Sequence, residues 1–215
     1  MSDSSSSYYA TWSRDEQISF WLNAYNAITI YAIVSNYPIE PGVWLSRVRF
    51  PKNSIRQIKD VWSTEYFDLA GKPRSLNQIE HEILRREFGE PRIHFALVCA
   101  SVGCPPLANE PYAGDRLEAQ LKRDAHGFIN DRDKVYVDKE ENILYASSVS
   151  RWYAEDFETV SDAAWLREYG RGDRGFLEFI ARYIDDDSRD YIAANVPRIV
   201  YLDYDWSLNE LVISG

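Results

Sequence analysis

The chain has 215 residues, of which 45% are apolar, 14% aromatic and 27% charged. This composition is typical of a globular protein, and it excludes a disordered chain, a collagen-like repeat and a disulfide-dense mini-protein. The net charge of −10 argues against a partner such as duplex nucleic acid. No apolar run approaches the roughly 18 residues of a membrane helix, so we expect no integral membrane segment.

The N-terminal part of the chain predicts one long helix after a flexible lead-in. Residues 1–12 begin with a serine run that has neither the basic head nor the apolar middle of a signal peptide. Ser13 and Glu16 form a capping-box pattern, and apolar residues then recur at helical spacing over 14–35. Because both sides of this helix are apolar, we expect it to lie inside the molecule.

A connecting segment follows, marked by Pro38, Pro41 and Gly42. Against the acidic background it carries a group of basic side chains, for which a solvated face is the ordinary interpretation. These side chains are Arg47, Arg49, Lys52, Arg56 and Lys59.

The middle of the chain predicts a second helix and a buried strand. Ser75 and Gln78 form another capping-box pattern at the start of a helix over 76–88, which ends before Gly89. The apolar stretch 92–98 lies between Pro91 and the turn at 101–106, and it therefore indicates a short buried strand.

The remaining elements complete the predicted fold class. We expect a helix from about residue 115, a hairpin from 134–137 and 143–146, and helical segments near 149–157, 163–169 and 176–184. A last strand is expected at 198–202. These elements predict one α+β domain over 13–215, largely helical with a small buried mixed sheet.

The chain also contains a glycine pattern that resembles a nucleotide-binding loop. Gly170, Gly172 and Gly175 have the G-x-G-x-x-G spacing, but the segment before them predicts a helix instead of the required strand. We therefore interpret them as a helix stop and a turn. Without a P-loop, an H-E-x-x-H motif or a C-x-x-C motif, the sequence predicts no cofactor.

One group of residues has the chemistry of a cysteine-dependent enzyme. A thiol needs a nearby base to become a nucleophile, and a buried carboxylate needs a partner. Cys104 as nucleophile, His94 as base and Glu80 as orienting acid meet both needs, with backbone groups near Gly103 as candidate oxyanion donors. The alternation of side chains along a regular strand would turn Cys99 away from His94.

Structural interpretations of the same residues remain open. A cysteine in an apolar segment is often a small core residue, a histidine beside a carboxylate is often a core pair, and Cys99 and Cys104 can form a local disulfide. A zinc site built from His81, His94 and the two cysteines is disfavoured, because the spacings do not match common ligand patterns. We expect no metal.

A second set of polar and aromatic residues is typical either of buried backbone contacts or of a cleft that binds a polar ligand. The candidate substrate-binding residues are Asn23, Asn26, His81, Cys99, Trp152 and Asp205. Tyr153, Asp156, Trp206 and Asn209 share the pattern, and for each residue taken singly the structural role is favoured.

Several strings taken together resemble the domain of unknown function 547 family. They are 20–27 (FWLNAYNA), 79–81 (IEH) with 83–85 (ILR), 92–97 (RIHFAL), 101–107, 150–153 (SRWY) with 156–157 (DF), and 205–209 (DWSLN). The resemblance implies that bacterial members are often exported or envelope proteins and that members carry more sequence before the first helix. It also implies that plant members often have serine where this chain has Cys104.

These observations lead to two hypotheses. The first is a cysteine-dependent hydrolase or acyl transferase that acts on a peptide-like or amide substrate. The second is a non-catalytic module that binds a small-molecule, peptide-like or protein ligand and in which the Glu, His and Cys residues form a structural cluster. The sequence leaves the location open: we expect a bacterial periplasmic or exported protein if an upstream signal was removed, and a cytoplasmic protein otherwise.

Overall fold

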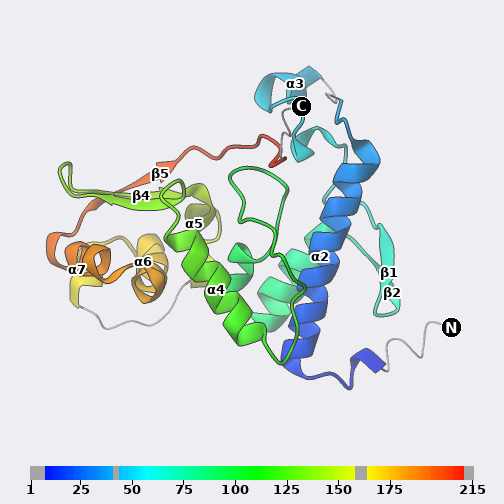
Figure 1. The fold of residues 1–215 in the computed structure, drawn as a ribbon, viewed down its shortest axis with the longest axis horizontal. Helices are drawn as coiled ribbons and strands as arrows, with labels where there is room; N and C mark the ends of the chain where they lie inside the picture. Colours follow the sequence, from blue (N-terminus) through cyan, green and yellow to red (C-terminus); the bar gives the residue numbers. More distant parts are fainter. Residues whose placement is uncertain (1–7, 41–43, 158–163, 211–215) are drawn as a thin grey trace. The chain divides into compact units, whose positions relative to one another are not determined.

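A computed structural model of the chain describes residues 8–40, 44–157 and 164–210 (Figure 1). It has the predicted α+β class, mainly helical with a small mixed sheet. The chain divides into two compact units, which we describe separately. The first unit comprises residues 1–121 and 205–215, and the second comprises 122–204. The expected division into a lead-in over 1–12 and one domain over 13–215 stays a prediction.

Helix α2 (Arg14–Asn36) is the long helix of the first unit and confirms the predicted element. Ser13 Oγ accepts a hydrogen bond from the Glu16 N–H, and the Glu16 carboxylate accepts one from the Ser13 N–H at 2.7 Å. These bonds hold the pKa of Glu16 below its ordinary value. One face of α2 is buried, but Ile30, Tyr31 and Val34 are exposed. The expectation that the helix lies wholly inside the molecule is therefore wrong.

Residues 8–12 pack on α2, although the whole of 1–12 was expected to be flexible. The Trp21 indole N–H donates to the Tyr9 hydroxyl at 2.7 Å, and the rings of Trp12 and Phe20 lie 5.5 Å apart. Aromatic side chains bury much surface per ordered residue, so this short segment gains enough contact to fold back on the helix. Burial raises the pKa of Tyr9.

The other elements of the first unit follow α2 in the chain. They are α3 (Trp44–Arg49), η1 (Ile55–Gln57), the antiparallel pair β1 (Phe67–Leu69) and β2 (Lys72–Arg74), the π-helix η2 (Gln78–Phe88), the 3₁₀ helix η3 (Pro91–Phe95) and the start of α4 (Leu117–Ile129). The reciprocal Ser75 and Gln78 cap precedes η2 as predicted. Helix η2 packs on α2, and Ile79, Ile83 and Leu84 join the core of that helix.

The predicted strand over 92–98 is wrong, because this segment begins with η3. Pro91 favours a helical first turn, and the Glu90 carboxylate caps it by accepting from the Arg92 N–H at 3.1 Å. The burial expected for a core strand is nevertheless present, since residues 93–98 are all buried. The alternation argument that separated His94 from Cys99 therefore does not apply.

An ion pair fixes the start of η3. The Arg92 guanidinium donates to the Glu90 carboxylate at 2.7 Å and 2.8 Å, and to Glu118 at 2.8 Å. Burial alone would raise the pKa of Glu90, but the hydrogen bonds and charge of Arg92 outweigh it and lower that pKa. The same bonds raise the pKa of Arg92. This ion pair thus holds the start of the segment 92–98, for which the sequence predicted a strand.

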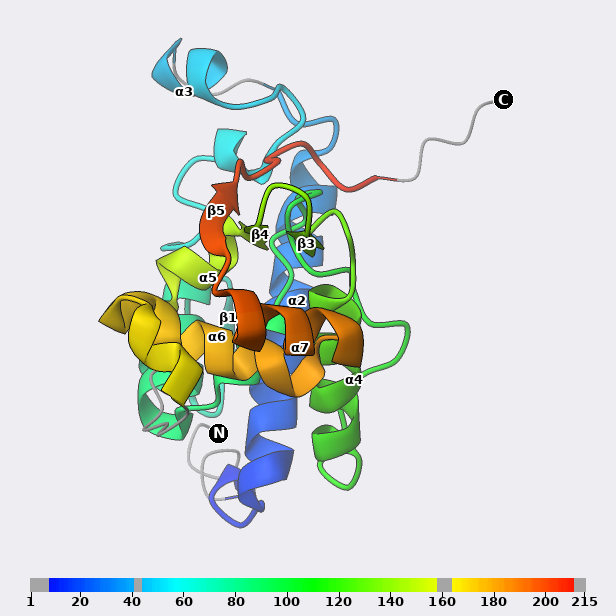
Figure 2. The ribbon, with the colours of Figure 1, turned by 90° about the vertical axis from the view of Figure 1, so that its left-hand side faces the viewer.

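The second unit contains the three-stranded sheet and the C-terminal helices. Strands β3 (Val135–Asp138) and β4 (Ile143–Ser147) form the predicted antiparallel hairpin, and β5 (Arg198–Leu202) pairs with β4 in parallel. Helices α6 (Arg171–Tyr183) and α7 (Asp186–Asn195) lie on one side of this sheet (Figures 1 and 2). The shorter helices are α5 (Ser148–Trp152), η4 (Ala154–Phe157) and η5 (Ala164–Glu168).

The helical segments of the second unit agree with the predictions in part. Helix α7 had no counterpart among the predicted elements, and residue 163 of the predicted segment 163–169 lies outside the described residues. Gly170 caps α6 at its N-terminus, whereas Gly172 and Gly175 lie within that helix. The interpretation of this glycine pattern as a helix stop and a turn is therefore wrong beyond Gly170.

Candidate functional site

A disulfide closes the loop over residues 99–104. Cys99 and Cys104 are bonded, with their Cα atoms 6.1 Å apart, and Cys104 is buried. Ala100 has a φ of 58°, in the left-handed region that few residues other than glycine adopt, so the loop turns sharply after Cys99. The local disulfide that the sequence left open is therefore present in the structure, and Cys104 has no free thiol.

The segment 205–209 holds this loop by backbone pairing. The N–H groups of Val102 and Gly103 donate to the carbonyls of Ser207 and Asp205 at 2.8 Å and 2.9 Å. The Cys104 N–H donates to the Ser101 carbonyl at 3.0 Å. The backbone donors near Gly103, which were the candidate oxyanion donors, are therefore engaged within the protein.

Glu80 is buried in η2 and forms a hydrogen bond with a side chain of α2. Its carboxylate accepts a hydrogen bond from the Tyr25 hydroxyl at 2.9 Å. His81, on the exposed side of η2, has its Nδ1 4.0 Å from Glu80 Oε1 and 3.0 Å from the Arg85 guanidinium. His94 is buried in η3. The first unit thus contains the three candidate catalytic residues Glu80, His94 and Cys104, all of them buried.

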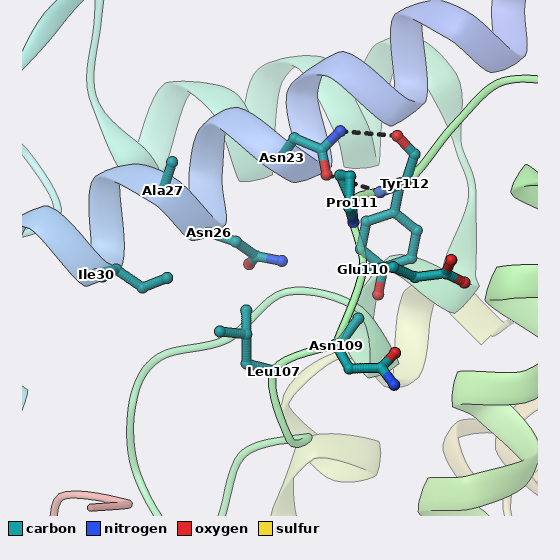
Figure 3. Close-up of a pocket in the computed structure, with 10 residues that line it drawn as sticks. Asn23, Asn26, Ala27, Ile30, Leu107, Asn109, Glu110, Pro111 and Tyr112 are labelled. Carbon is teal, nitrogen blue, oxygen red and sulfur yellow. Dashed lines mark hydrogen bonds between the residues drawn. The ribbon is translucent and has the colours of Figure 1, made fainter.

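Asn23 and Asn26 clamp two segments of backbone to α2. The Asn23 amide donates to the Tyr112 carbonyl at 2.8 Å and accepts from the Tyr112 N–H at 2.9 Å (Figure 3). The Asn26 amide donates to the Ala96 carbonyl at 3.0 Å and accepts from the Val98 N–H at 3.0 Å. These contacts give both asparagines the structural role that the sequence favoured for each residue singly.

A pocket of about 410 Å³ lies between α2 and the loop over residues 107–112 (Figure 3). Asn23 and Asn26 line it, together with Ala27 and Ile30 from α2 and the residues of the loop. The exposed fractions of Ile30 and Leu107 are 43% and 51%, which is high for apolar side chains. The pocket therefore presents an apolar wall to solvent.

Two candidate residues, Trp152 and Asp205, do not line this pocket. Trp152 belongs to the second unit, where its exposed ring lies 4.8 Å from the ring of Tyr204. Asp205 belongs to the first unit, and its carboxylate accepts from the Ser207 N–H at 2.8 Å. The site that the structure assembles is thus the pocket and the disulfide loop of the first unit.

The sequence did not identify the apolar wall of the pocket. Ala27, Ile30 and Val34 follow one another at helical spacing on the exposed side of α2, which was the available signal. Because the opposite side of α2 is apolar too, the same signal predicts a helix that lies inside the molecule. The contribution of Leu107 carries no comparable signal, because it depends on the path of a loop without regular structure.

The described residues contain neither a candidate metal cluster nor a membrane-spanning helix. No group of three or more His, Cys, Asp or Glu side chains in this part of the chain could hold a metal ion. Within the same residues, no helix has both the length and the apolar character needed to cross a membrane.

The fold and the site define an α+β domain in which a long helix carries an apolar pocket and supports a disulfide-closed loop. Residues 9–129 match the model of the family described as "Protein of unknown function, DUF547", and the chain belongs to this family. The family that the motifs indicated is thereby confirmed, and the match contains the motifs from 20–27 to 101–107. No match was found among curated proteins or among solved structures.

Proposed function

We propose that this protein is a non-catalytic binding module whose pocket between α2 and the 107–112 loop takes a small, mainly apolar ligand. The observation that carries the proposal is the exposed apolar wall formed by Ile30 and Leu107. Solvent exposure of apolar surface is unfavourable, and a ligand that covers it gains the corresponding free energy.

The size and rigidity of the pocket support this proposal. A volume of about 410 Å³ lies within the range of small-molecule sites. Asn23 fixes the loop to α2 through two hydrogen bonds to Tyr112, so the two walls keep their spacing without a ligand. Binding to a preformed site avoids the entropic cost of ordering the loop.

The state of the disulfide loop also favours binding over catalysis. Nucleophilic catalysis needs a thiolate, and an oxyanion hole needs unoccupied N–H donors. In this loop Cys104 is bonded to Cys99, and the N–H of Gly103 donates to the Asp205 carbonyl. The loop therefore has the properties of a structural element that is closed by its own bonds.

Indole is a suitable test ligand, because it is small, apolar and soluble in water. We expect indole to shift the methyl NMR signals of Ile30 and Leu107 in a saturable manner. Ile30→Glu places a charge in the apolar wall, so we expect it to weaken binding by about tenfold or more. Val34→Glu is the matched control, since Val34 is exposed on the same helix but does not line the pocket.

The outcome of this titration decides the proposal. Saturable shifts that Ile30→Glu abolishes and Val34→Glu preserves would support it. Shifts that grow linearly with indole concentration, or that respond equally to both variants, would contradict a defined site in this pocket.

A second candidate function applies to the reduced chain, as a cysteine-dependent hydrolase or acyl transferase for a peptide-like or amide substrate. One contact favours it, namely the Cys99 N–H that lies 2.9 Å from Cys104 Sγ. A backbone donor at that distance would stabilise a Cys104 thiolate once the disulfide is opened. His94 would then act as the base and Glu80 as the orienting acid.

Two single variants separate this candidate from a structural role. Cys99→Ala frees the Cys104 thiol and keeps the backbone N–H at position 99, whereas Cys104→Ala leaves only the Cys99 thiol. If the second candidate is correct, iodoacetamide at pH 7 will alkylate Cys99→Ala at least about tenfold faster than free cysteine. The same variant will hydrolyse p-nitrophenyl acetate, and Cys104→Ala will not. Equal alkylation rates without turnover would rule out this function.

A further inference from the structure

Arg56 occupies an aromatic cage in the first unit. Its guanidinium carbon lies 4.5 Å from the centroid of the Phe50 ring, 5.2 Å from that of Trp62 and 5.1 Å from that of Trp206. The three rings come from separate parts of the chain, at the end of the α3 region, after η1 and in the C-terminal segment. The cage is therefore assembled by the tertiary fold and does not arise from local sequence.

The charge of this arginine is not balanced by an acid. No carboxylate of the described residues forms an ion pair with Arg56 or with Arg49, whose guanidinium carbon lies 5.6 Å from the same Phe50 ring. Burial lowers the pKa of Arg56, and the positive charge of Arg49 lowers it further. Two arginines thus share one aromatic ring without a counter-charge.

The surrounding sequence adds to this local excess of positive charge. Residues 41–59 carry five basic side chains and no acidic one, in a chain with a net charge of −10. The one acid that follows directly, Asp60, has its carboxylate 4.0 Å from Lys59 Nζ. The segment 41–59 is therefore positively charged within an acidic chain.

The geometry of the guanidinium indicates what such a patch can bind. A guanidinium is planar, so aromatic rings can cover its faces while its five N–H donors lie in the plane. This planar fork suits the oxygen atoms of a carboxylate or phosphate. A half-buried cation that lacks a counter-charge gains most from a doubly charged anion, and a second guanidinium is available in Arg49.

We propose that Arg56 and Arg49 form an anion site that binds the phosphate group of a small phosphate-bearing ligand. Contacts with Phe50, Trp62 and Trp206 restrict the Arg56 side chain, so its donors lose less conformational freedom when they meet the phosphate oxygens. This site uses none of the residues that line the pocket, and it stands whether or not the pocket binds a ligand.

Tryptophan fluorescence of the full chain provides the test, because Trp62 and Trp206 contact Arg56 directly. Titration with inorganic phosphate is expected to change the emission in a saturable manner, and added salt should weaken the binding. Phenyl phosphate, titrated in parallel, distinguishes an ester from free phosphate, and acetate serves as the carboxylate comparison. We expect either phosphate compound to bind at least about tenfold more tightly than acetate, which carries a single charge.

Three variants make the assignment specific. Arg56→Gln is expected to weaken phosphate binding by about tenfold or more, and Arg49→Gln to weaken it by a smaller factor. Lys59→Gln is the matched control, because this side chain is 90% exposed in the same basic segment and lies outside the cage. If Arg56→Gln does not fold, Arg49→Gln carries the test, since Arg49 is exposed.

The proposal fails if phosphate and phenyl phosphate produce no saturable change. It also fails if Lys59→Gln weakens binding as much as the arginine variants do, because the effect would then be one of general charge. Tighter binding of acetate than of phosphate would overturn the assignment of the ligand. Selective loss in the arginine variants, with Lys59→Gln unaffected, supports it.

Discussion

Replacement of Asn26 by alanine is expected to lower the free energy of unfolding by about 2–4 kcal/mol. The Asn26 side chain is buried and satisfies two buried backbone groups, the Ala96 carbonyl and the Val98 N–H. Alanine would leave both groups without these partners, and each unsatisfied group costs about 1–3 kcal/mol. Urea denaturation at 25 °C and pH 7 measures the difference.

Asn36→Ala is the control for this experiment. Asn36 lies on the same helix, and its exposed side chain donates to the Ala32 carbonyl within the last turn. We expect a change of no more than about 0.5 kcal/mol, because water can replace that contact. If Asn26→Ala were as mild as Asn36→Ala, the clamp would not contribute to the stability of the segment that follows η3.

Replacement of Gly114 by alanine is expected to destabilise the protein by about 1–3 kcal/mol through steric overlap. A Cβ atom at position 114 would lie 2.6 Å from Glu16 Cγ and 2.9 Å from the Glu16 backbone nitrogen. The side chain could move, but the backbone nitrogen belongs to the first turn of α2 and is held by the Ser13 cap. Thermal unfolding, monitored by circular dichroism, measures the resulting decrease in Tm.

The matching substitution Gly127→Ala should act in the opposite direction. Gly127 lies in α4, and a Cβ atom there would meet no other atom within 4 Å. Alanine in a helix interior is favoured over glycine by about 0.5–1 kcal/mol. We therefore expect a small rise in stability. A loss at position 127 as large as that at position 114 would show that the effect of Gly114→Ala is not due to the close approach of Glu16.

The elements that the sequence predicted correctly are those with local signals. Helix α2 follows from the Ser13 and Glu16 cap and an apolar period, and the β3–β4 hairpin follows from two apolar runs with a polar turn. Strand β5 has the predicted bounds, since Arg198 and a run of four apolar residues follow Pro197. Each signal lies within a few residues of the element that it specifies.

The errors arise where distant residues decide the structure. The segment after Pro91 has the burial of a strand, but its backbone partners come from Asn26, 70 positions earlier in the chain. No pattern within 92–98 can report that partner, so apolar composition alone suggested a strand. Helix α2 was expected to be covered on all sides because composition does not show that the 107–112 loop leaves Ile30 exposed.

The sequence singled out several residues of the candidate site, but it did not indicate which groups their side chains contact. The sequence indicates that Asn23 and Asn26 bind either a polar ligand or buried backbone groups. In the structure both side chains form hydrogen bonds with backbone groups. Cys104 was predicted to be a nucleophile and Cys99 a substrate-binding residue, with a local disulfide as the open alternative that the structure presents. Residue type indicates what a side chain can do, whereas its actual partner depends on the tertiary fold.

The pairing between the 99–104 loop and segment 205–209 has a consequence for the order in which the protein is made. The ribosome releases residues 122–204 before the C-terminal segment that holds the loop. Until that segment emerges, the N–H groups of Val102 and Gly103 have no access to the carbonyls that they bond in the folded chain. The loop that contains Cys104 therefore reaches its final hydrogen bonding only after residues 205–207 have been made, so the first unit is completed after the second has been translated.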